Sequence, residues 1–269
     1  MQIAAIQMVS GPRVEDNLAA AGRLLAEAAG QGCEFAVLPE NFCLMAGSDA
    51  AKLAVREAPG AGPVQDFLAA TARRLGLWIV GGTLPLRASD DQHLHNTSLA
   101  YSPQGECVAR YDKIHLFKFE NGREQYDESR VIEAGGAPQS FTLASRDGHA
   151  WRVGLSVCYD LRFPELYRGL GADLLLVPSA FTLTTGQAHW EVLLRARAIE
   201  NLAYVCAPAQ GGKHENGRRT WGHSMVVDPW GELVAQRADE GAGVVLADLD
   251  IARIAQVRQQ LPALDHRVL

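Results

Sequence analysis

The sequence predicts an α/β protein in which β-sheets pack on each other and helices cover the outside. Short apolar runs alternate with amphipathic helical patterns in the first third of the chain and around residue 158. In the middle and near the end, such runs follow one another without helices between them. The run DLLLVPS is continuously apolar, as expected of a strand buried on both faces. These observations favour two packed sheets over the alternative, one large mixed sheet.

The individual elements follow from hydrophobic periodicity. In residues 14–29, Leu18, Leu25 and Ala28 fall on one helical face, which predicts a helix with one buried side. Further helices are predicted at 64–75, 163–170, 187–199 and 251–260. Strands are predicted at 2–8, 35–39, 77–84, 96–102, 106–114, 152–160, 173–179, 203–209, 223–229 and 243–250. The polar tracts 119–129 and 213–222 are predicted to be loops.

Composition and charge narrow the class of protein. Of the 269 residues, 48% are hydrophobic and 21% are charged, which is ordinary for a globular enzyme. The formal net charge is −6 and no stretch is basic, so no nucleic-acid partner is expected. No signal-like segment and no apolar run of about 18 residues occurs, so we expect a cytoplasmic protein without a membrane partner. No linker divides the chain, and we expect one domain over residues 1–269.

The cysteines indicate neither a disulfide framework nor a metal site. They are odd in number, and none stands at CxxC spacing. They are Cys33, Cys43, Cys107, Cys158 and Cys206. With the thiols reduced, one of them is available for chemistry.

Cys158 is the candidate nucleophile. It follows an apolar strand in RVGLSVCYD and precedes the helical pattern FPELYRGL. At a strand-to-helix turn, the neighbouring backbone N–H groups point into space and can stabilise a thiolate or an oxyanion. The competing interpretation is a buried cysteine that only fills the core.

A nucleophilic thiol also needs a base. The histidines His115, His189 and His223 are candidates, because partners of a cysteine meet in space rather than in sequence. Glu40 ends the apolar run FAVLPE, and Lys113 follows a strand in YDKIHLF. A carboxylate could take the thiol proton, and an ammonium could balance an oxyanion. Taken singly, both are equally compatible with surface charges at strand ends.

Other catalytic motifs lack support. The segment GHSMV at 222–226 resembles part of the serine-hydrolase G-x-S-x-G motif, but its last residue is Val226 and it opens a strand. No Walker loop, dinucleotide-binding fingerprint or HExxH motif occurs, so nucleotide and zinc chemistry are not predicted.

Taken together, LPEN with Glu40, YDKIHLF with Lys113 and VCYDLRFPEL with Cys158 resemble the nitrilase (carbon–nitrogen hydrolase) superfamily. Their order and spacing match, and the resemblance runs from MQIAAIQ to DLDIARI, nearly the whole chain. It implies a four-layer αββα sandwich, assembly into a homodimer or a higher homo-oligomer, and catalysis without a metal or organic cofactor.

The resemblance also implies roles for the site residues. Glu40 is expected to be the general base, and Cys158 the nucleophile that forms a thioester. Lys113 is expected to stabilise the tetrahedral intermediate together with the backbone N–H of Tyr159. A second glutamate, which orients the lysine, maps best onto Glu128 in QYDES. Its neighbours Glu124 and Glu133 are the alternatives.

Within the superfamily, CYDLRFPEL, the segment from PSAFTLTTG to CAPAQ, and GHSMVVDPWGELVA resemble the amidases that hydrolyse deaminated glutathione. A close alternative is an ω-amidase acting on α-ketoglutaramate. A non-catalytic relative that binds metabolites or partners is the alternative from another class. The intact residues Glu40, Lys113 and Cys158 argue against that reading.

Both amidase substrates are small molecules with an α-keto acid, so a cation should lie near the nucleophile. Arg162 is our candidate because arginine binds carboxylates through two parallel hydrogen bonds. Its alternative role is an ion pair with Asp160 or Glu165. Phe181, Thr182 and Thr185 follow a strand end and are expected to line the same pocket. Tract 119–129 is expected to border this pocket, whereas tract 213–222 is expected to be a solvated turn.

Overall fold

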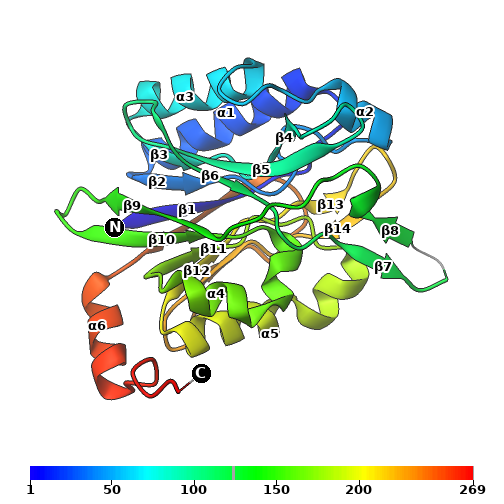
Figure 1. The fold of residues 1–269 in the computed structure, drawn as a ribbon. Coiled ribbons are helices and arrows are strands. Elements are labelled where there is room, and N and C mark those ends of the chain that lie inside the picture. The colour runs from blue at the N-terminus through cyan, green and yellow to red at the C-terminus, as the bar shows by residue number, and fades with distance from the viewer. Residues whose placement is uncertain (123–124, 269) are drawn as a thin grey trace.

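Two β-sheets form the centre of the molecule (Figure 1). The computed structural model describes residues 1–122 and 125–268. The first sheet has the order β17-β1-β2-β3-β5-β4, with β6 also paired to β5. Its strands are β1 (Gln2–Gln7), β2 (Phe35–Val37), β3 (Trp78–Val80), β4 (Leu84–Arg87), β5 (Leu94–Tyr101), β6 (Cys107–Asp112) and β17 (Gly243–Asp248).

The second sheet has the order β16-β15-β12-β11-β10-β9. Its strands are β9 (Gln139–Ala144), β10 (Ala150–Leu155), β11 (Leu174–Leu176), β12 (Tyr204–Ala207), β15 (Met225–Val227) and β16 (Leu233–Gln236). In both sheets the central strands are parallel and the outer pairs antiparallel: β1, β2 and β3 in one sheet, β10, β11 and β12 in the other. The carboxyl ends of each parallel set therefore meet at one edge, which is where ligands bind in such sheets.

Helices cover the outer face of each sheet. In Figure 1, α1 and α3 lie over the first sheet, while α4 and α5 lie against the second. The helices are α1 (Val14–Gly30), α2 (Asp49–Ala54), α3 (Pro63–Leu75), α4 (Pro164–Leu170), α5 (Leu183–Asn201) and α6 (Ile251–Gln260), with 3-10 turns η1 (Glu128–Arg130) and η2 (Cys158–Arg162). The predicted four-layer αββα sandwich is therefore confirmed, and the alternative of one mixed sheet is wrong.

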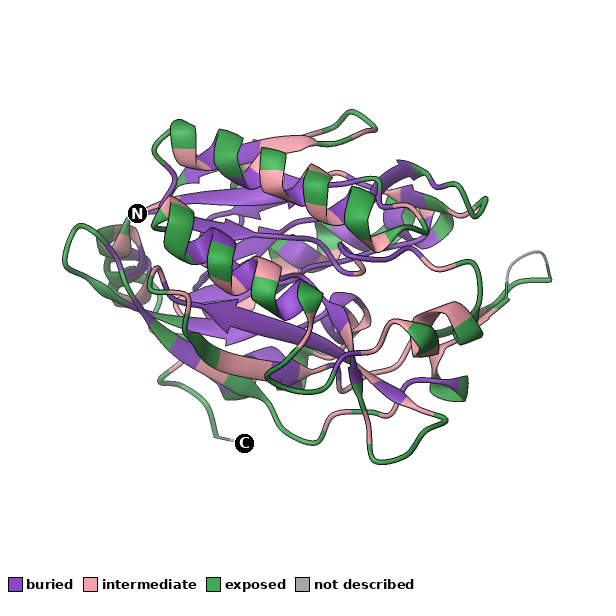
Figure 2. Ribbon diagram, turned by 90° about the horizontal axis from the view of Figure 1, so that it is seen from above, coloured by how far each residue is buried: buried purple, intermediate pink, exposed green. Residues whose placement is uncertain are grey.

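Strand β1 shows how both faces of a sheet are buried. Ile3 and Ala5 belong to the cluster of apolar side chains between the two sheets. Ala4 and Ile6 point the other way, into the cluster beneath α1 and α3. Because successive side chains of a strand face opposite sides, the central positions of β1, residues 3–6, are all apolar. Figure 2 shows the same division, with buried sheets inside helices whose outer faces are exposed.

The two polar tracts predicted as loops are β-hairpins, which corrects that prediction. Tract 119–129 lies in the hairpin of β7 (Lys118–Glu120) and β8 (Gln125–Asp127). Tract 213–222 lies in the hairpin of β13 (Gly211–Lys213) and β14 (Arg219–Trp221). Each hairpin is a separate two-stranded sheet. Each of these four strands is only three residues long, which is too short to show the alternating pattern by which strands are recognised.

A sharp turn divides the predicted strand 77–84. Strand β3 ends at Val80 and β4 begins at Leu84. Gly82 between them has φ +46°, and a Cβ there would lie 1.9 Å from the Pro39 carbonyl oxygen. Only glycine therefore allows this turn to approach the segment that carries Glu40. Across residues 1–122 and 125–268, no helix is both long enough and apolar enough to cross a bilayer.

Candidate active site

Three strand ends bring the predicted catalytic residues to one place. Glu40 lies three residues beyond β2, Lys113 directly follows β6, and Cys158 lies three residues beyond β10. The first two come from one sheet and the third from the other. All three are buried, with exposed fractions of 2%, 1% and 7%. The face-to-face packing of the sheets thus assembles a carboxylate, an ammonium and a thiol between them.

Lys113 is held by two carboxylates. Its Nζ lies 2.9 Å from Glu40 Oε1 and 2.8 Å from Glu128 Oε2. Glu128 is fixed in turn by the backbone N–H of Phe117, which donates to Oε2 at 2.7 Å. Of the alternatives for this second glutamate, Glu133 instead accepts hydrogen bonds from Ser89. Glu124 lies outside the described residues.

Further donors fix the Glu40 carboxylate in orientation. Asn96 on β5 donates to Oε1 at 3.0 Å, and the backbone N–H of Ala180 donates to Oε2 at 2.9 Å. The Gln210 amide also binds the Glu40 carbonyl oxygen at 3.1 Å. Sequence reasoning missed Asn96, because it stands among other polar residues of β5 and nothing local distinguishes it from them.

The backbone at Cys158 is in the left-handed region, with φ +51°. A non-glycine residue there is strained and must be held by its surroundings. The Cys158 N–H donates to the Pro178 carbonyl at 3.0 Å. By contrast, no acceptor in residues 1–122 or 125–268 takes the N–H of Tyr159. The turn therefore presents one free backbone donor next to the thiol.

Asp160 links the Cys158 turn to the Lys113 segment. Its fully buried carboxylate accepts hydrogen bonds from Val157 N–H at 2.8 Å, from the Tyr111 hydroxyl at 2.7 Å and from His115 N–H at 3.1 Å. The His115 Nδ1 lies 2.7 Å away. Tyr111 and His115 flank Lys113, so one carboxylate fixes both sides of the site. The sequence suggests Asp160 only as an ion-pair partner for Arg162, and nothing local in it indicates this network.

Burial and neighbouring charges set the protonation states of Cys158, Glu40 and Lys113. Burial raises the pKa of the Cys158 thiol well above its usual range, and the Glu40 charge adds to this. Burial acts to raise the pKa of Glu40 too, but the Lys113 ammonium and a hydrogen bond from the thiol outweigh it, so that pKa is lowered. Burial acts to lower the pKa of Lys113, and Glu128 and Glu40 overcome this, so that pKa is raised. Near neutral pH the site holds a neutral thiol beside an ionised carboxylate.

A narrow inner pocket opens beside Cys158. It is lined by all the residues predicted to contact substrate, namely Tyr159, Arg162, Phe181, Thr182 and Thr185. Its free volume is only about 10 Å³. None of the described residues that line it is a histidine, and the histidine candidates have other contacts: His115 binds Asp160, His189 binds Arg162, and His223 binds the Trp221 carbonyl.

Arg162 lies across aromatic rings in this inner pocket. Its guanidinium carbon is 5.9 Å from the centre of the Tyr159 ring and 5.6 Å from that of Phe181. One of its nitrogens lies 3.3 Å from His189 Nδ1. Neither Asp160 nor Glu165, nor any other described carboxylate, forms an ion pair with it. The alternative role of Arg162 as half of an ion pair is therefore wrong.

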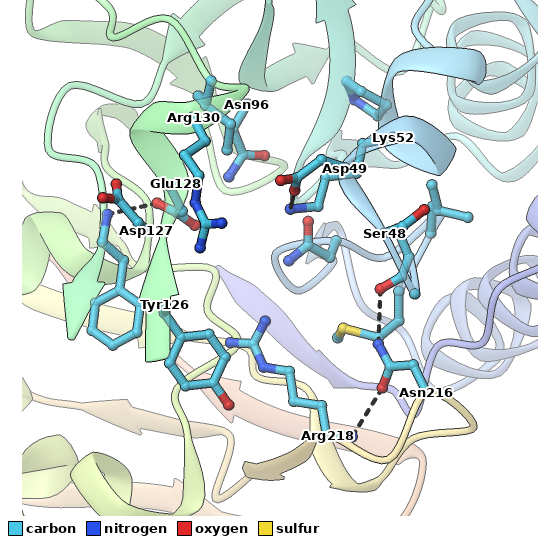
Figure 3. A pocket seen from close by; sticks show the side chains of 18 of the residues that line it. Ser48, Asp49, Lys52, Asn96, Tyr126, Asp127, Glu128, Arg130, Asn216 and Arg218 are labelled. Carbon is cyan, nitrogen blue, oxygen red and sulfur yellow. Dashed lines mark hydrogen bonds and ion pairs between the residues drawn. The ribbon is translucent and has the colours of Figure 1, made fainter. Parts of the chain in front are cut away.

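A larger outer cavity adjoins the inner pocket (Figure 3). Its volume is about 860 Å³, within the usual range of small-molecule sites. Phe117, Glu128 and Arg218 line both spaces. Hairpin β7–β8 forms one wall, as expected of tract 119–129. Residues 216–219 form another wall, so tract 213–222 is not only a solvated turn. Within the described part of the chain, no three His, Cys, Asp or Glu side chains are placed to hold a metal ion.

Comparison with known proteins gives a consistent result. A family model described as carbon–nitrogen hydrolase matches residues 2–259. The chain is similar to the deaminated glutathione amidase of Synechocystis sp. (strain PCC 6803 / GT-S), at 44% identity over 98% of this chain and 97% of that protein. It is also similar to omega-amidase NIT2 of Danio rerio, at 36% identity over 99% and 94%.

Among solved structures, the chain resembles Saccharomyces cerevisiae Nit3, a member of branch 10 of the nitrilase superfamily. The TM-score is 0.87 at 29% identity, over 100% of this chain and 97% of that one.

Proposed function

The chain belongs to the carbon–nitrogen hydrolase family, and from that premise we propose that it hydrolyses deaminated glutathione to 2-oxoglutarate and cysteinylglycine. The observation that carries this proposal is the neutral Cys158 thiol beside the ionised Glu40. The pocket next to them contains Arg162, which has no carboxylate partner among the described residues, and a large cavity adjoins it. The thiol and the carboxylate supply the chemistry of amide cleavage, and the large cavity has room for a two-residue leaving group.

In the acylation step, Cys158 Sγ attacks the amide carbon while Glu40 takes the thiol proton. The carbonyl oxygen becomes an oxyanion, which Lys113 Nζ and the Tyr159 N–H stabilise. Glu40 then gives the proton to the amide nitrogen, the carbon–nitrogen bond breaks, and the amine leaves. A thioester on Cys158 remains. Glu128 contacts the lysine throughout and keeps it aimed at the oxyanion.

In the second step, water hydrolyses the thioester. Glu40 takes a proton from the water, whose oxygen attacks the thioester carbon, and the same two donors stabilise the second oxyanion. The carbon–sulfur bond breaks, and the sulfur takes the proton back from Glu40. The acid product leaves, and the site returns to a neutral thiol beside a carboxylate.

Arg162 is the residue we assign to the α-keto acid carboxylate. In the free site its guanidinium rests on Tyr159 and Phe181, and the inner pocket is correspondingly narrow. A substrate carboxylate forms a stronger, two-point contact with the guanidinium than the rings do. Binding therefore draws the side chain from the rings and opens space for the keto acid. Thr182 and Thr185, whose hydroxyls lie 2.9 Å apart, offer polar contacts there.

An ω-amidase acting on α-ketoglutaramate is the second candidate. The 36% identity to omega-amidase NIT2 favours it, and the same inner pocket serves both substrates. The outer cavity favours deaminated glutathione, because α-ketoglutaramate releases only ammonia and leaves that cavity empty.

We also propose that the protein is a cytoplasmic homodimer. Large apolar side chains are exposed on and around α5 and β16, and these surfaces are continuous because Gly231 packs against Ile199. They are Val192, Ile199, Trp230, Leu233 and Val234. Such a patch is typical of a subunit interface. If size-exclusion chromatography with light scattering finds a monomer at micromolar concentration, the dimer proposal is wrong.

The decisive experiment compares hydrolysis of deaminated glutathione and α-ketoglutaramate by the purified protein. We expect a higher kcat/KM for deaminated glutathione, since only that substrate uses both spaces. A preference for α-ketoglutaramate would make the protein an ω-amidase. If neither compound is hydrolysed, the substrate assignment is wrong.

A further inference from the structure

The cations around the outer cavity fall into two groups. Lys52 has a carboxylate partner, since its Nζ lies 3.5 Å from Asp49. Arg219 likewise pairs with Glu240, at 2.7 Å. Arg130 and Arg218 line the same cavity, and no carboxylate in residues 1–122 or 125–268 lies within ion-pair distance of either. The cavity therefore holds two positive charges that are available to an anion.

Arg218 lies at the reacting end of this cavity. It lines the inner pocket as well as the outer one, and it donates to the Ala180 carbonyl at 2.7 Å. Its guanidinium carbon is 5.2 Å from the centre of the Tyr126 ring. The neighbouring N–H of Ala180 binds Glu40, so Arg218 is within the surroundings of the reacting atoms.

Arg130 lines only the outer cavity. It is the last residue of η1, and Figure 3 shows its guanidinium pointing into the open space. The carboxylates nearest to it in sequence are already engaged. Asp127 pairs with Lys118 at 3.2 Å, and Glu128 pairs with Lys113. The positive charge of Arg130 is therefore not neutralised from within η1.

We propose that the outer cavity is the leaving-group site and that Arg130 binds the terminal carboxylate of a peptide-like amine there. This inference rests on the proposed function and adds a position for the second charge of the substrate. Because the keto acid is proposed to occupy the inner pocket at Arg162, the dipeptide on the other side of the scissile bond is left with the outer cavity of about 860 Å³. Two residues span about 7 Å. The planar guanidinium matches a carboxylate through two hydrogen bonds.

The test uses a change in the substrate and a change in the protein. The probes are deaminated glutathione and its analogue in which the glycine carboxylate is a carboxamide. We expect the parent protein to prefer the acid over the amide by about tenfold in kcat/KM, as befits one charged contact. In Arg130→Gln the preference should fall to about one, mainly through a higher KM for the acid.

Arg219→Gln is the matched control, because it removes an arginine from the same cavity whose charge already has a partner. It should retain the parent's preference. Arg130 is exposed, so its replacement is expected to leave folding intact. An undiminished preference in Arg130→Gln, or none in the parent protein, would overturn the inference alone. If the parent does not hydrolyse deaminated glutathione at all, the proposed function itself is overturned.

Discussion

The reacting centre and the outer cavity differ in how far their side chains are buried and in how their charges are neutralised. At the centre, Glu40, Lys113 and Cys158 lie at strand ends, are nearly inaccessible to water, and have their charges balanced within the protein. The outer cavity is formed by hairpins and exposed segments, and its Arg130 and Arg218 have no carboxylate partner among residues 1–122 and 125–268. Chemistry thus depends on groups that the fold fixes before substrate arrives. Substrate binding depends on charged side chains that are neutralised only when the substrate binds.

The largest expected effect tests the centre itself. Cys158→Ala should abolish turnover, because no other described side chain in the inner pocket is a thiol. The unfolding free energy should change by no more than about 1–2 kcal/mol, since only one sulfur atom is lost. Steady-state kinetics and denaturant unfolding measure the two quantities. Cys158→Ser should also be inactive, and substantial activity in either variant would refute the covalent mechanism.

The next effect tests whether the centre is pre-positioned. In Asp160→Asn, an amide faces the donors Val157 N–H, Tyr111 and His115, so the link between the Cys158 turn and the Lys113 segment is broken. Misplaced catalytic groups should lower kcat by about 10²-fold. KM should change little, because the residue lies away from the substrate.

Tyr111→Phe gives a graded comparison with Asp160→Asn. It removes a single donor to the Asp160 carboxylate, and its effect on kcat should be smaller. If both variants retained the parent's kcat while losing stability, the network would have only a structural role.

Replacing a substrate-binding residue should have the opposite effect, a change in KM with little change in kcat. Arg162→Lys keeps a positive charge but loses the two-point contact with a carboxylate. We expect KM for an α-keto acid amide to rise by about tenfold with kcat nearly retained. Initial-rate measurements over a range of substrate concentrations separate the two constants. An unchanged KM would mean that Arg162 does not bind the substrate carboxylate. The distinction between residues that set kcat and residues that set KM would then not hold.

The smallest effect concerns pH. The pKa of Glu40 is below its ordinary value of 4.5, so its contribution to stability is present above that pH and is lost as pH falls through the folded pKa. The pKa of Lys113 is above its ordinary value of 10.5, so its contribution is complete below that pH and is lost as pH rises further. The contributions of Glu40 and Lys113 to the unfolding free energy should therefore be constant between these limits.

Glu40→Gln should weaken the loss of stability at acidic pH, as measured by denaturant unfolding across the pH range. The control is Asp127→Asn on the outer hairpin. Hydrogen bonds from Ser129 and Lys118 lower the pKa of Asp127, but its surroundings are solvated and its effect should be minor. Equal effects of the two variants would mean that burial does not distinguish the two regions.

The elements that bury apolar surface could be predicted from the sequence, and the others could not. Residues 14–29 and 251–260 match α1 and α6 closely, because one helical face must be apolar. Hairpins β7–β8 and β13–β14 were missed, since strands of three residues are too short to show an alternating pattern. Strand β9 was missed as well, although Phe141 and Leu143 alternate with more exposed neighbours. That period-2 signal was available.

The residues of the site likewise fall into those that the sequence identifies and those that it does not. Glu40, Lys113 and Cys158 were identifiable because three motifs at strand ends occur in the order that the superfamily uses. Spacing alone did not exclude histidine as the base. The contributions of Asn96 and Asp160 are set by contacts between segments distant in sequence. Local sequence cannot reveal such partners.

The 3-10 turn η1 has a practical consequence for anyone wishing to redesign the specificity. Within three residues it carries Glu128, which holds Lys113, and Arg130, which faces the outer cavity. Exchanging hairpin β7–β8 together with η1 for another sequence would therefore alter substrate choice and turnover at once. Asn216, Gly217 and Arg219 line the same cavity, whereas the Lys113 ammonium is hydrogen-bonded to Glu40 and Glu128. Libraries of variants are better directed to these residues, where selectivity can change while Lys113 stays in place.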